Sequence, residues 1–308
     1  MIPEANNAVS YALGTGRCGT KFLYKLLDLE PNVSSVHERN SLNETFHRYC
    51  KWYGVDIDNE GFLHTKEKEI QADLAKSDFS FESSAYLSLS VEELYQRFNA
   101  KFILLVRAPE KVVNSYLRKG WYDKPFIRAN ADLPPSYQES KRFHHFLGRL
   151  APSGDAFNNW QKMSRVGKLG WYWNALNAKV LEQFKNIPED HWRIEKLEEF
   201  SYEQHFKIAE FLGIRVTVPR EQFQNLVFSR PNAAPNVPSF TSWGQSEIEE
   251  FEQQVLPMAK YFGYEHRIDR ILRSSSEQRF SSREDIDDLS SSSGALSKAV
   301  TSLRKFFG

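Results

Sequence analysis

The segment 7-NAVSYALGTGRCGTKFLYKLLDL-29 combines a buried strand, a glycine-rich turn and an amphipathic helix, in that order. In its turn, residues 14–20, backbone N–H groups can point at an oxyanion, and the following helix adds its positive end and unpaired amides. We therefore predict a cradle for a phosphate or sulfate. The nucleotide-triphosphatase form G-x-x-x-x-G-K-[ST] is not met, because Gly19 is followed by Thr20 and Lys21, which disfavours ordinary ATP hydrolysis.

The composition is that of a globular protein. With 308 residues, 41% of them hydrophobic, the chain can bury one large core, and its 40 basic and 40 acidic residues balance, so no nucleic-acid partner is expected. Cys18 and Cys50 can build neither a disulfide framework nor a spaced metal site. Because the sequence shows no signal-peptide pattern and no apolar run of about 18 residues, we expect a cytoplasmic protein.

Short apolar segments alternate with helix-favouring stretches. One segment ends at His37-Glu38, a second (79–81) precedes Ser83, and the third, KFILLV at 101–106, stops at Arg107 before a proline that suits a helix start. This order predicts an α/β fold of three layers, with a mostly parallel central sheet and helices on both faces. Ligands of such sheets bind at the carboxyl ends of the strands, so these side chains would gather at one edge.

Other local patterns predict further elements. Ser90 and Glu93 have the spacing of a capping box that starts a helix through Phe98. A polar helical stretch covers 41–76, helical periodicity returns at 171–184, a strand is expected at 191–194, and a short helix at 208–212. The aromatic residues Trp171, Tyr172 and Trp173 are expected to belong to the core.

The remaining segments divide the chain. We interpret residues 120–165 as a substrate-side insertion, in which His144-His145 lacks companions for a metal site. Nine serines between 274 and 293 predict a disordered linker over 273–294, which leaves a folded domain at 1–272. Residues 295–308 have the pattern of a basic amphipathic helix, which would dock at an anionic membrane surface or on a partner, or else pack on its own domain.

Two anion-binding segments about 90 residues apart suggest a ligand with two phosphate-like groups, because Arg107 and Ser115 could hold a second phosphate. At these residues the sequence resembles the sulfotransferases that use 3′-phosphoadenosine 5′-phosphosulfate (PAPS). Residues 14–22 (GTGRCGTKF) resemble their 5′-phosphosulfate loop, and 102–116 (FILLVRAPEKVVNSY) resemble their 3′-phosphate motif. Weaker matches bring the likeness to roughly residues 7–266; they are 31–38, Tyr172-Trp173 with Asn177, and 211–213.

The resemblance implies a P-loop-type fold and an in-line transfer of a sulfuryl group from PAPS to an acceptor hydroxyl or amine, with 3′,5′-bisphosphoadenosine (PAP) leaving and no metal required. Cations and amides would stabilise the leaving phosphate, and a base would take the acceptor's proton. Glu38 is the implied base, with His37 as its substitute, and Arg17 and Lys21 are the catalytic cations. The cofactor-binding residues would be Gly16, Arg17, Cys18, Gly19, Thr20, Lys21, Phe22, Arg107 and Ser115.

Several readings stay open at this stage. The acceptor could be a small molecule, a carbohydrate or a lipid, and the last would suit peripheral membrane contact through the tail. A P-loop kinase would share the cradle, but it needs a metal-holding hydroxyl after the loop lysine and an acidic partner at a strand end. A nucleotide-binding protein without catalysis is the other alternative. Cys18 could be a reactive thiol at a helix start, although a plain loop residue is expected.

Overall fold

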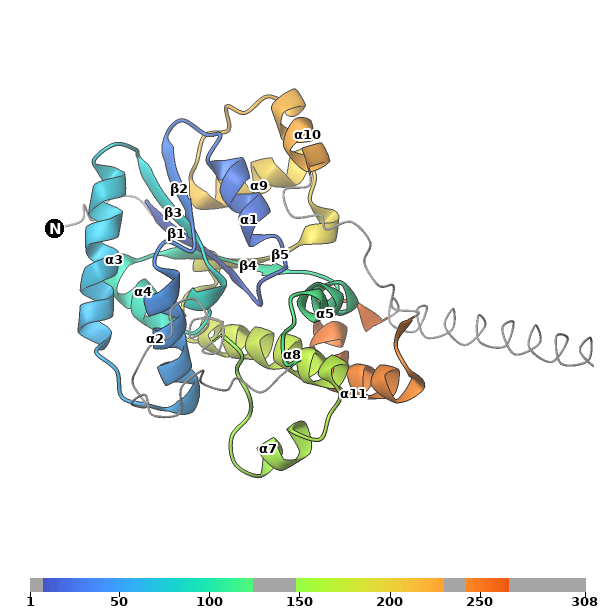
Figure 1. Cartoon of the computed structure of the whole chain (residues 1–308). Coiled ribbons are helices and arrows are strands. Elements are labelled where there is room, and N and C mark those ends of the chain that lie inside the picture. Colours follow the sequence, from blue (N-terminus) through green and yellow to red (C-terminus); the bar gives the residue numbers. More distant parts are fainter. Residues whose placement is uncertain (1–7, 124–147, 230–241, 266–308) are drawn as a thin grey trace, which may run out of the picture.

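The computed structural model describes residues 8–123, 148–229 and 242–265 (Figure 1). Within these residues five parallel strands form one sheet in the order β2-β3-β1-β4-β5. The predicted parallel sheet is thereby confirmed. The strands are β1 (Val9–Gly14), β2 (Val33–His37), β3 (Phe79–Ser83), β4 (Lys101–Val106) and β5 (Trp192–Lys196).

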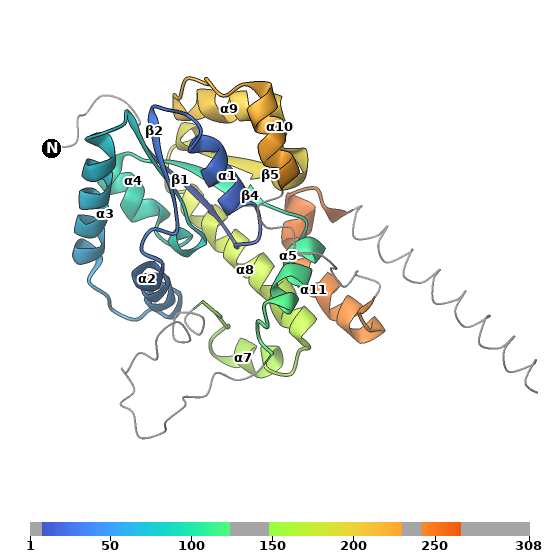
Figure 2. The same ribbon diagram turned by 45° about the horizontal axis from the view of Figure 1, so that its top comes forward.

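One face of the sheet is covered by α1, α9 and α10 (Figure 2). Their apolar side chains pack on the side chains that alternate strand positions present to this face, such as Ile103 and Leu105 of β4. The helices are α1 (Thr20–Leu27), α9 (Tyr202–Leu212) and α10 (Arg220–Ser229).

The opposite face holds the larger core. Phe102, Leu104 and Val106 of β4 point into it, and α8 crosses it with the fully buried Trp173. Two layers of helices therefore enclose the sheet, as the sequence predicts. The elements on this side are α2 (Ser41–Tyr53), α3 (Asn59–Leu74), α4 (Val91–Phe98), α5 (Pro109–Arg118), α7 (Asp155–Trp160), α8 (Arg165–Phe184) and α11 (Gln245–Tyr261). Short 3₁₀ turns are η1 (Ala85–Leu87), η2 (Glu189–His191) and η3 (Leu197–Glu199).

Some predicted boundaries differ from the structure. The stretch 41–76 is two helices, α2 and α3, separated after Gly54, which has a left-handed φ of 64°. Helix α8 begins six residues before Trp171, because the Ser164 hydroxyl accepts a hydrogen bond from the Gly167 amide and caps it. Helix α9 likewise begins before 208, at Tyr202, and is capped by Ser201.

The capping box predicted at Ser90 and Glu93 is wrong, although the helix does begin at Val91. The Ser90 hydroxyl lies 3.3 Å from Nδ1 of His47, and the Glu93 carboxylate pairs with Lys51 at 2.9 Å. Tertiary partners on α2 therefore replace the local cap, which a sequence spacing alone does not reveal.

Parts of the predicted organisation lie outside the described residues: the linker at 273–294, the amphipathic segment at 295–308 and the pair His144-His145. Among the helices that the structure describes, none is long and apolar enough to cross a membrane.

Candidate active site

The turn between β1 and α1 depends on glycine at two positions. Gly16 has a φ of 78°, and a Cβ there would lie 2.4 Å from the hydroxyl oxygen of Tyr116. Gly19 has a φ of 110°, and a Cβ there would lie 2.7 Å from Cδ1 of Leu197. Because side chains are strained in this left-handed region and have no space here, glycine alone lets the chain enter α1 in this way. The Phe22 amide bonds the Gly19 carbonyl at 2.9 Å, so the amides of Thr20 and Lys21 are the ones at the start of α1 that have no helical carbonyl to bond.

The carbonyl groups of the same turn face the protein interior. The Thr15 carbonyl accepts hydrogen bonds from Tyr116 at 2.5 Å and from Tyr172 at 3.3 Å, and the Gly14 carbonyl accepts one from Ser88 at 2.9 Å. The negative ends of these peptides are thus held by hydroxyl groups of α5, α8 and the β3–α4 connection. This leaves the amide side of the loop for an anion.

The two sequence motifs meet at Arg17. Its Nε donates to the Ser115 hydroxyl at 2.8 Å, and Nη1 of Arg107 donates to the Arg17 carbonyl at 3.1 Å. Burial lowers the pKa of Arg107, which nevertheless keeps its charge at neutral pH. Two guanidinium groups and a hydroxyl, drawn from segments about 90 residues apart, therefore lie together beside the turn.

Cys18 and Phe22 contribute to packing. The Cys18 thiol is completely buried, and burial raises its pKa to about 11 despite nearby backbone amides, so it is neutral at physiological pH. The ring of Phe22 packs edge-on against Phe200, with 5.1 Å between ring centroids. Cys18 is therefore a plain loop residue, as expected, and Phe22 is a partly buried residue that packs against the core on the α1 side of the sheet.

The end of β2 brings His37 and Glu38 to the same edge. Nε2 of His37 lies 3.3 Å from the Thr20 hydroxyl, and Nδ1 lies 3.8 Å from a carboxylate oxygen of Glu38. Burial and the charge of Lys21 lower the pKa of His37 to about 4, so the ring is neutral at pH 7. The Glu38 backbone has a left-handed φ of 50°, and its amide bonds the Ser83 carbonyl at 3.1 Å.

Glu38 has a pKa near neutral pH. Burial and the neighbouring Glu44 raise its pKa to about 7, while the charges of Arg48, Arg17 and Lys21 act in the opposite direction. A carboxyl with this pKa suits general-base catalysis at physiological pH. His37, whose pKa of about 4 makes it a weak base and whose Nε2 is engaged by Thr20, fits the role of substitute less well.

A buried ion network supports this strand end. Nζ of Lys66 lies 2.6 Å from Glu44, 2.8 Å from Glu82 and 2.9 Å from Glu69. Glu82 therefore points into the α2–α3 side of the sheet, whereas the adjacent Ser83 donates to the Thr20 carbonyl on the α1 side, at 2.9 Å. Ser83, and not Glu82, adjoins the anion loop.

Sequence reasoning missed the aromatic wall behind the turn. Tyr116 and Tyr172 stand in segments that carry the family resemblance, but nothing in a sequence shows that both hydroxyls bond the Thr15 carbonyl. Arg48 was missed as well, because an arginine in a polar helical stretch is ordinarily exposed. In the fold it is completely buried, with its guanidinium 5.0 Å above the ring of Tyr86.

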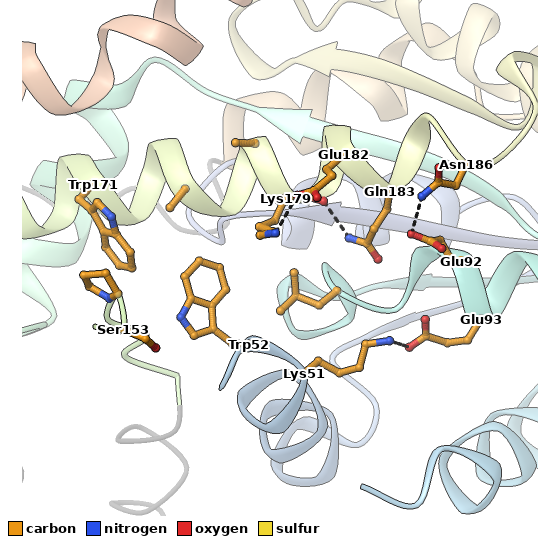
Figure 3. A pocket seen from close by; sticks show the side chains of 14 residues that line it. Lys51, Trp52, Glu92, Glu93, Ser153, Trp171, Lys179, Glu182, Gln183 and Asn186 are labelled. Atoms are coloured by element: carbon orange, nitrogen blue, oxygen red, sulfur yellow. Dashed lines mark hydrogen bonds and ion pairs between the residues drawn. The ribbon is translucent and has the colours of Figure 1, made fainter. Parts of the chain in front are cut away.

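A separate groove of about 630 Å³ lies between α2, α4 and α8 (Figure 3). The indole rings of Trp52 and Trp171 stand at right angles at one end, with centroids 5.8 Å apart. Its charged groups are paired with one another or with an amide: Lys51 with Glu93, Lys179 with Glu182, and Glu92 with Asn186. No predicted site residue lines this groove, so it is distinct from the sheet edge.

Within residues 8–123, 148–229 and 242–265, no group of three His, Cys, Asp or Glu side chains is arranged to hold a metal ion. The described site is built from amides, cations, hydroxyls and the carboxyl of Glu38.

The described residues form a parallel α/β sheet with a glycine-rich turn between its first strand and first helix. Comparison with family profiles and with curated protein sequences gave no match. Among solved structures, the fold is similar to the sulfotransferase STF9 from Mycobacterium avium, with a TM-score of 0.52 and 13% identity over 83% of this chain and 77% of that chain. The chain thus has a sulfotransferase fold.

Two further solved structures are similar to this chain at lower TM-scores. The sulfotransferase domain of the Synechococcus PCC 7002 olefin synthase has a TM-score of 0.45 and 14% identity, over 86% of this chain and 98% of that one. The sulfotransferase domain from the curacin biosynthetic pathway has a TM-score of 0.45 and 13% identity, over 80% of this chain and 83% of that one.

Proposed function

We propose that this protein is an enzyme that transfers a sulfuryl group from PAPS to an acceptor hydroxyl or amine. The observation that carries the proposal is the meeting of Arg17, Arg107 and Ser115 beside a glycine turn, at the sheet edge where Glu38 titrates near neutral pH. A donor with two anionic ends needs two such binding groups, and the acceptor needs a base nearby.

The donor set fits PAPS. The turn amides, Arg17 and Lys21 would hold the 5′-phosphosulfate, and Arg107 with Ser115 would hold the 3′-phosphate. The charge of Glu198 acts on Arg107, while its carboxylate accepts hydrogen bonds from the Ala108 amide at 3.1 Å and the Tyr264 hydroxyl at 2.8 Å.

When bound, PAPS supplies the sulfuryl group and the bisphosphate that leaves. Glu38 then holds the acceptor hydroxyl and takes its proton as the oxygen attacks. Lys21, Arg17 and the first amides of α1 stabilise the negative charge that grows on the departing phosphate. The acceptor would be a small molecule, a carbohydrate or a lipid in the cytoplasm or, through the tail, at a membrane surface.

The residue after the loop lysine argues against the kinase alternative. A P-loop kinase places a hydroxyl there to hold magnesium, but this chain has Phe22, whose ring packs in the core. Transfer activity distinguishes the enzyme from a nucleotide-binding protein without catalysis.

Calorimetric titration with PAP, ATP and ATP plus magnesium tests the proposal. We expect metal-independent binding of PAP that Arg107→Ala weakens by about 100-fold, because a charged phosphate contact is lost. Lys111→Ala, which removes an exposed cation from the helix that follows Arg107, is the matched control. Preference for magnesium-ATP would favour the kinase, and transfer of labelled sulfate from PAPS to an acceptor panel would show turnover.

A further inference from the structure

Arg48 is a buried cation held by neutral groups. Its Nη1 donates to the Ala85 carbonyl at 3.0 Å and lies 3.4 Å from the Tyr172 hydroxyl, and Nη2 donates to the Gly148 carbonyl at 3.3 Å. Its Nε has no hydrogen-bond partner. Among the described residues no carboxylate lies within 4.0 Å of this guanidinium, so its charge is not neutralised by an ion pair.

Lys66 is a second buried cation, and its charge is neutralised by ion pairs as a structural role requires. Lys66 and Arg48 are both fully buried, but Lys66 contacts three carboxylates. Removing a charge from water without a counter-ion is costly, and an apolar side chain in its place is often as stable. The retained charge of Arg48 therefore points to a role in binding or catalysis.

The position of Arg48 places its charge on the acceptor side of the site. The guanidinium lies over the ring of Tyr86, and its charge acts on the carboxyl of Glu38. Through Tyr172, whose hydroxyl lies within 3.4 Å of Arg48 and 3.3 Å of the Thr15 carbonyl, it also touches the loop. Nη1 of Arg48 bonds the Ala85 carbonyl, two residues beyond Ser83, whose carbonyl accepts a hydrogen bond from the Glu38 amide, so Arg48 lies near the strand end that holds Glu38 and behind the turn.

Charges around Glu38 come from several elements. Arg17 and Lys21 belong to the loop and α1, Glu44 and Arg48 to α2, and His37 is neutral. Glu44 is bonded to Lys66 and Ser84. On the proposed function, Arg17 and Lys21 face the anionic donor, which leaves Arg48 as the unneutralised charge on the acceptor side.

We propose that Arg48 sets the acceptor class: its buried positive charge beside Glu38 and Tyr86 makes the site accept neutral or anionic hydroxyl compounds and reject ammonium compounds. This inference rests on the proposed function and narrows it from hydroxyl or amine to hydroxyl. A protonated amine would meet a like charge at low local dielectric, which the ionised Glu38 and the anionic donor, itself facing Arg17 and Lys21, offset only in part.

The test uses the PAP-loaded protein and ligand-observed NMR. The probes are matched pairs that differ by one group: cyclohexanol and cyclohexylamine, benzyl alcohol and benzylamine, glucose and glucosamine. We expect the alcohols to bind roughly tenfold more tightly than the amines, a preference of the size that one partly screened charge produces. Arg48→Met should reduce this preference to about twofold or less, and Arg48→Lys should keep it.

Lys51→Met is the matched control, because it removes a cation from the same helix, in the groove of Figure 3. Three results would overturn the inference: wild type binds the alcohol and the amine of each pair equally, wild type binds no member of any pair, or Arg48→Met keeps the wild-type preference. A loss of the alcohol preference in Lys51→Met as large as in Arg48→Met would also overturn it. Thermal unfolding checks that each variant folds, and Arg48→Gln is used if Arg48→Met does not fold. Failure to bind PAP would instead refute the proposed function.

Discussion

On the proposed function, the sheet edge has a donor side and an acceptor side, and the two are built differently. The donor side, consisting of the β1–α1 turn, Arg107 and Ser115, uses backbone amides and cations from two short motifs. The acceptor side, consisting of Glu38, Arg48, Tyr86 and Tyr172, takes one side chain each from the end of β2, α2, η1 and α8. The donor, which is the same in every reaction, would bind mainly to backbone groups and cations of two short motifs. The acceptor would bind to side chains that only the tertiary fold brings together.

Glu38→Gln should separate the functions of the two sides most clearly. We expect kcat to fall by about 10²- to 10⁴-fold, because the base is lost, while PAP affinity stays within about twofold. Wild-type activity should rise as pH passes about 7, since Glu38 acts when ionised. Rates across pH and PAP calorimetry check both statements. A large loss of PAP affinity would mean that the two sides are not independent.

Lys66→Met should destabilise the buried ion network beneath the acceptor side. The change leaves Glu44 and Glu82 buried without their cation, at a cost of about 3–5 kcal/mol in the free energy of unfolding. Denaturant unfolding measures this, and Lys68→Met, an exposed lysine on the same helix, is the control. If both variants were equally stable, the network would not hold the strand end.

The same Glu38→Gln variant should also be more stable than wild type above pH 7. The folded-state pKa of Glu38 is raised from 4.5 to about 7, so its contribution to stability is present below pH 4.5 and is lost as pH rises to 7. Glutamine cannot ionise, and the gain should reach about 2 kcal/mol. Unfolding at pH 4 and pH 8 tests it; the absence of a pH-dependent difference would contradict the assigned environment.

Ser115→Ala tests the donor side with a smaller change. It removes the hydroxyl that Arg17 bonds at 2.8 Å, and we expect PAP to bind about tenfold more weakly. Thr65→Ala, which removes an exposed hydroxyl on α3, serves as the comparison. Unchanged PAP affinity would place the second phosphate elsewhere.

Cys18→Ala should have the smallest effect. The thiol is neutral and buried beneath the turn, so PAP affinity should change by about twofold or less. Alkylating reagents should leave PAP binding by the folded protein intact. Rapid inactivation that Cys18→Ala prevents would show that the thiol is reactive after all.

The sequence was informative where neighbouring residues decide the structure. The run 101–106 predicts β4 because each of its residues after Lys101 is buried, and the glycines of the turn predict its left-handed backbone. Arg48 could not be predicted as buried, nor Lys66 as the partner of three acids, because both depend on packing between distant elements. The false capping box at Ser90 has the same cause: His47, 43 residues away, bonds that hydroxyl.

The left-handed φ of Glu38 also governs which residues that position can tolerate. A β-branched side chain is a genuine outlier at this backbone angle, whereas glycine adopts it without strain. In a saturation library, Glu38→Gly should therefore yield folded protein without activity, and Glu38→Val should lose expression as well. Sorting such a library by folding and by turnover would distinguish a position kept for its chemistry from one kept for its backbone.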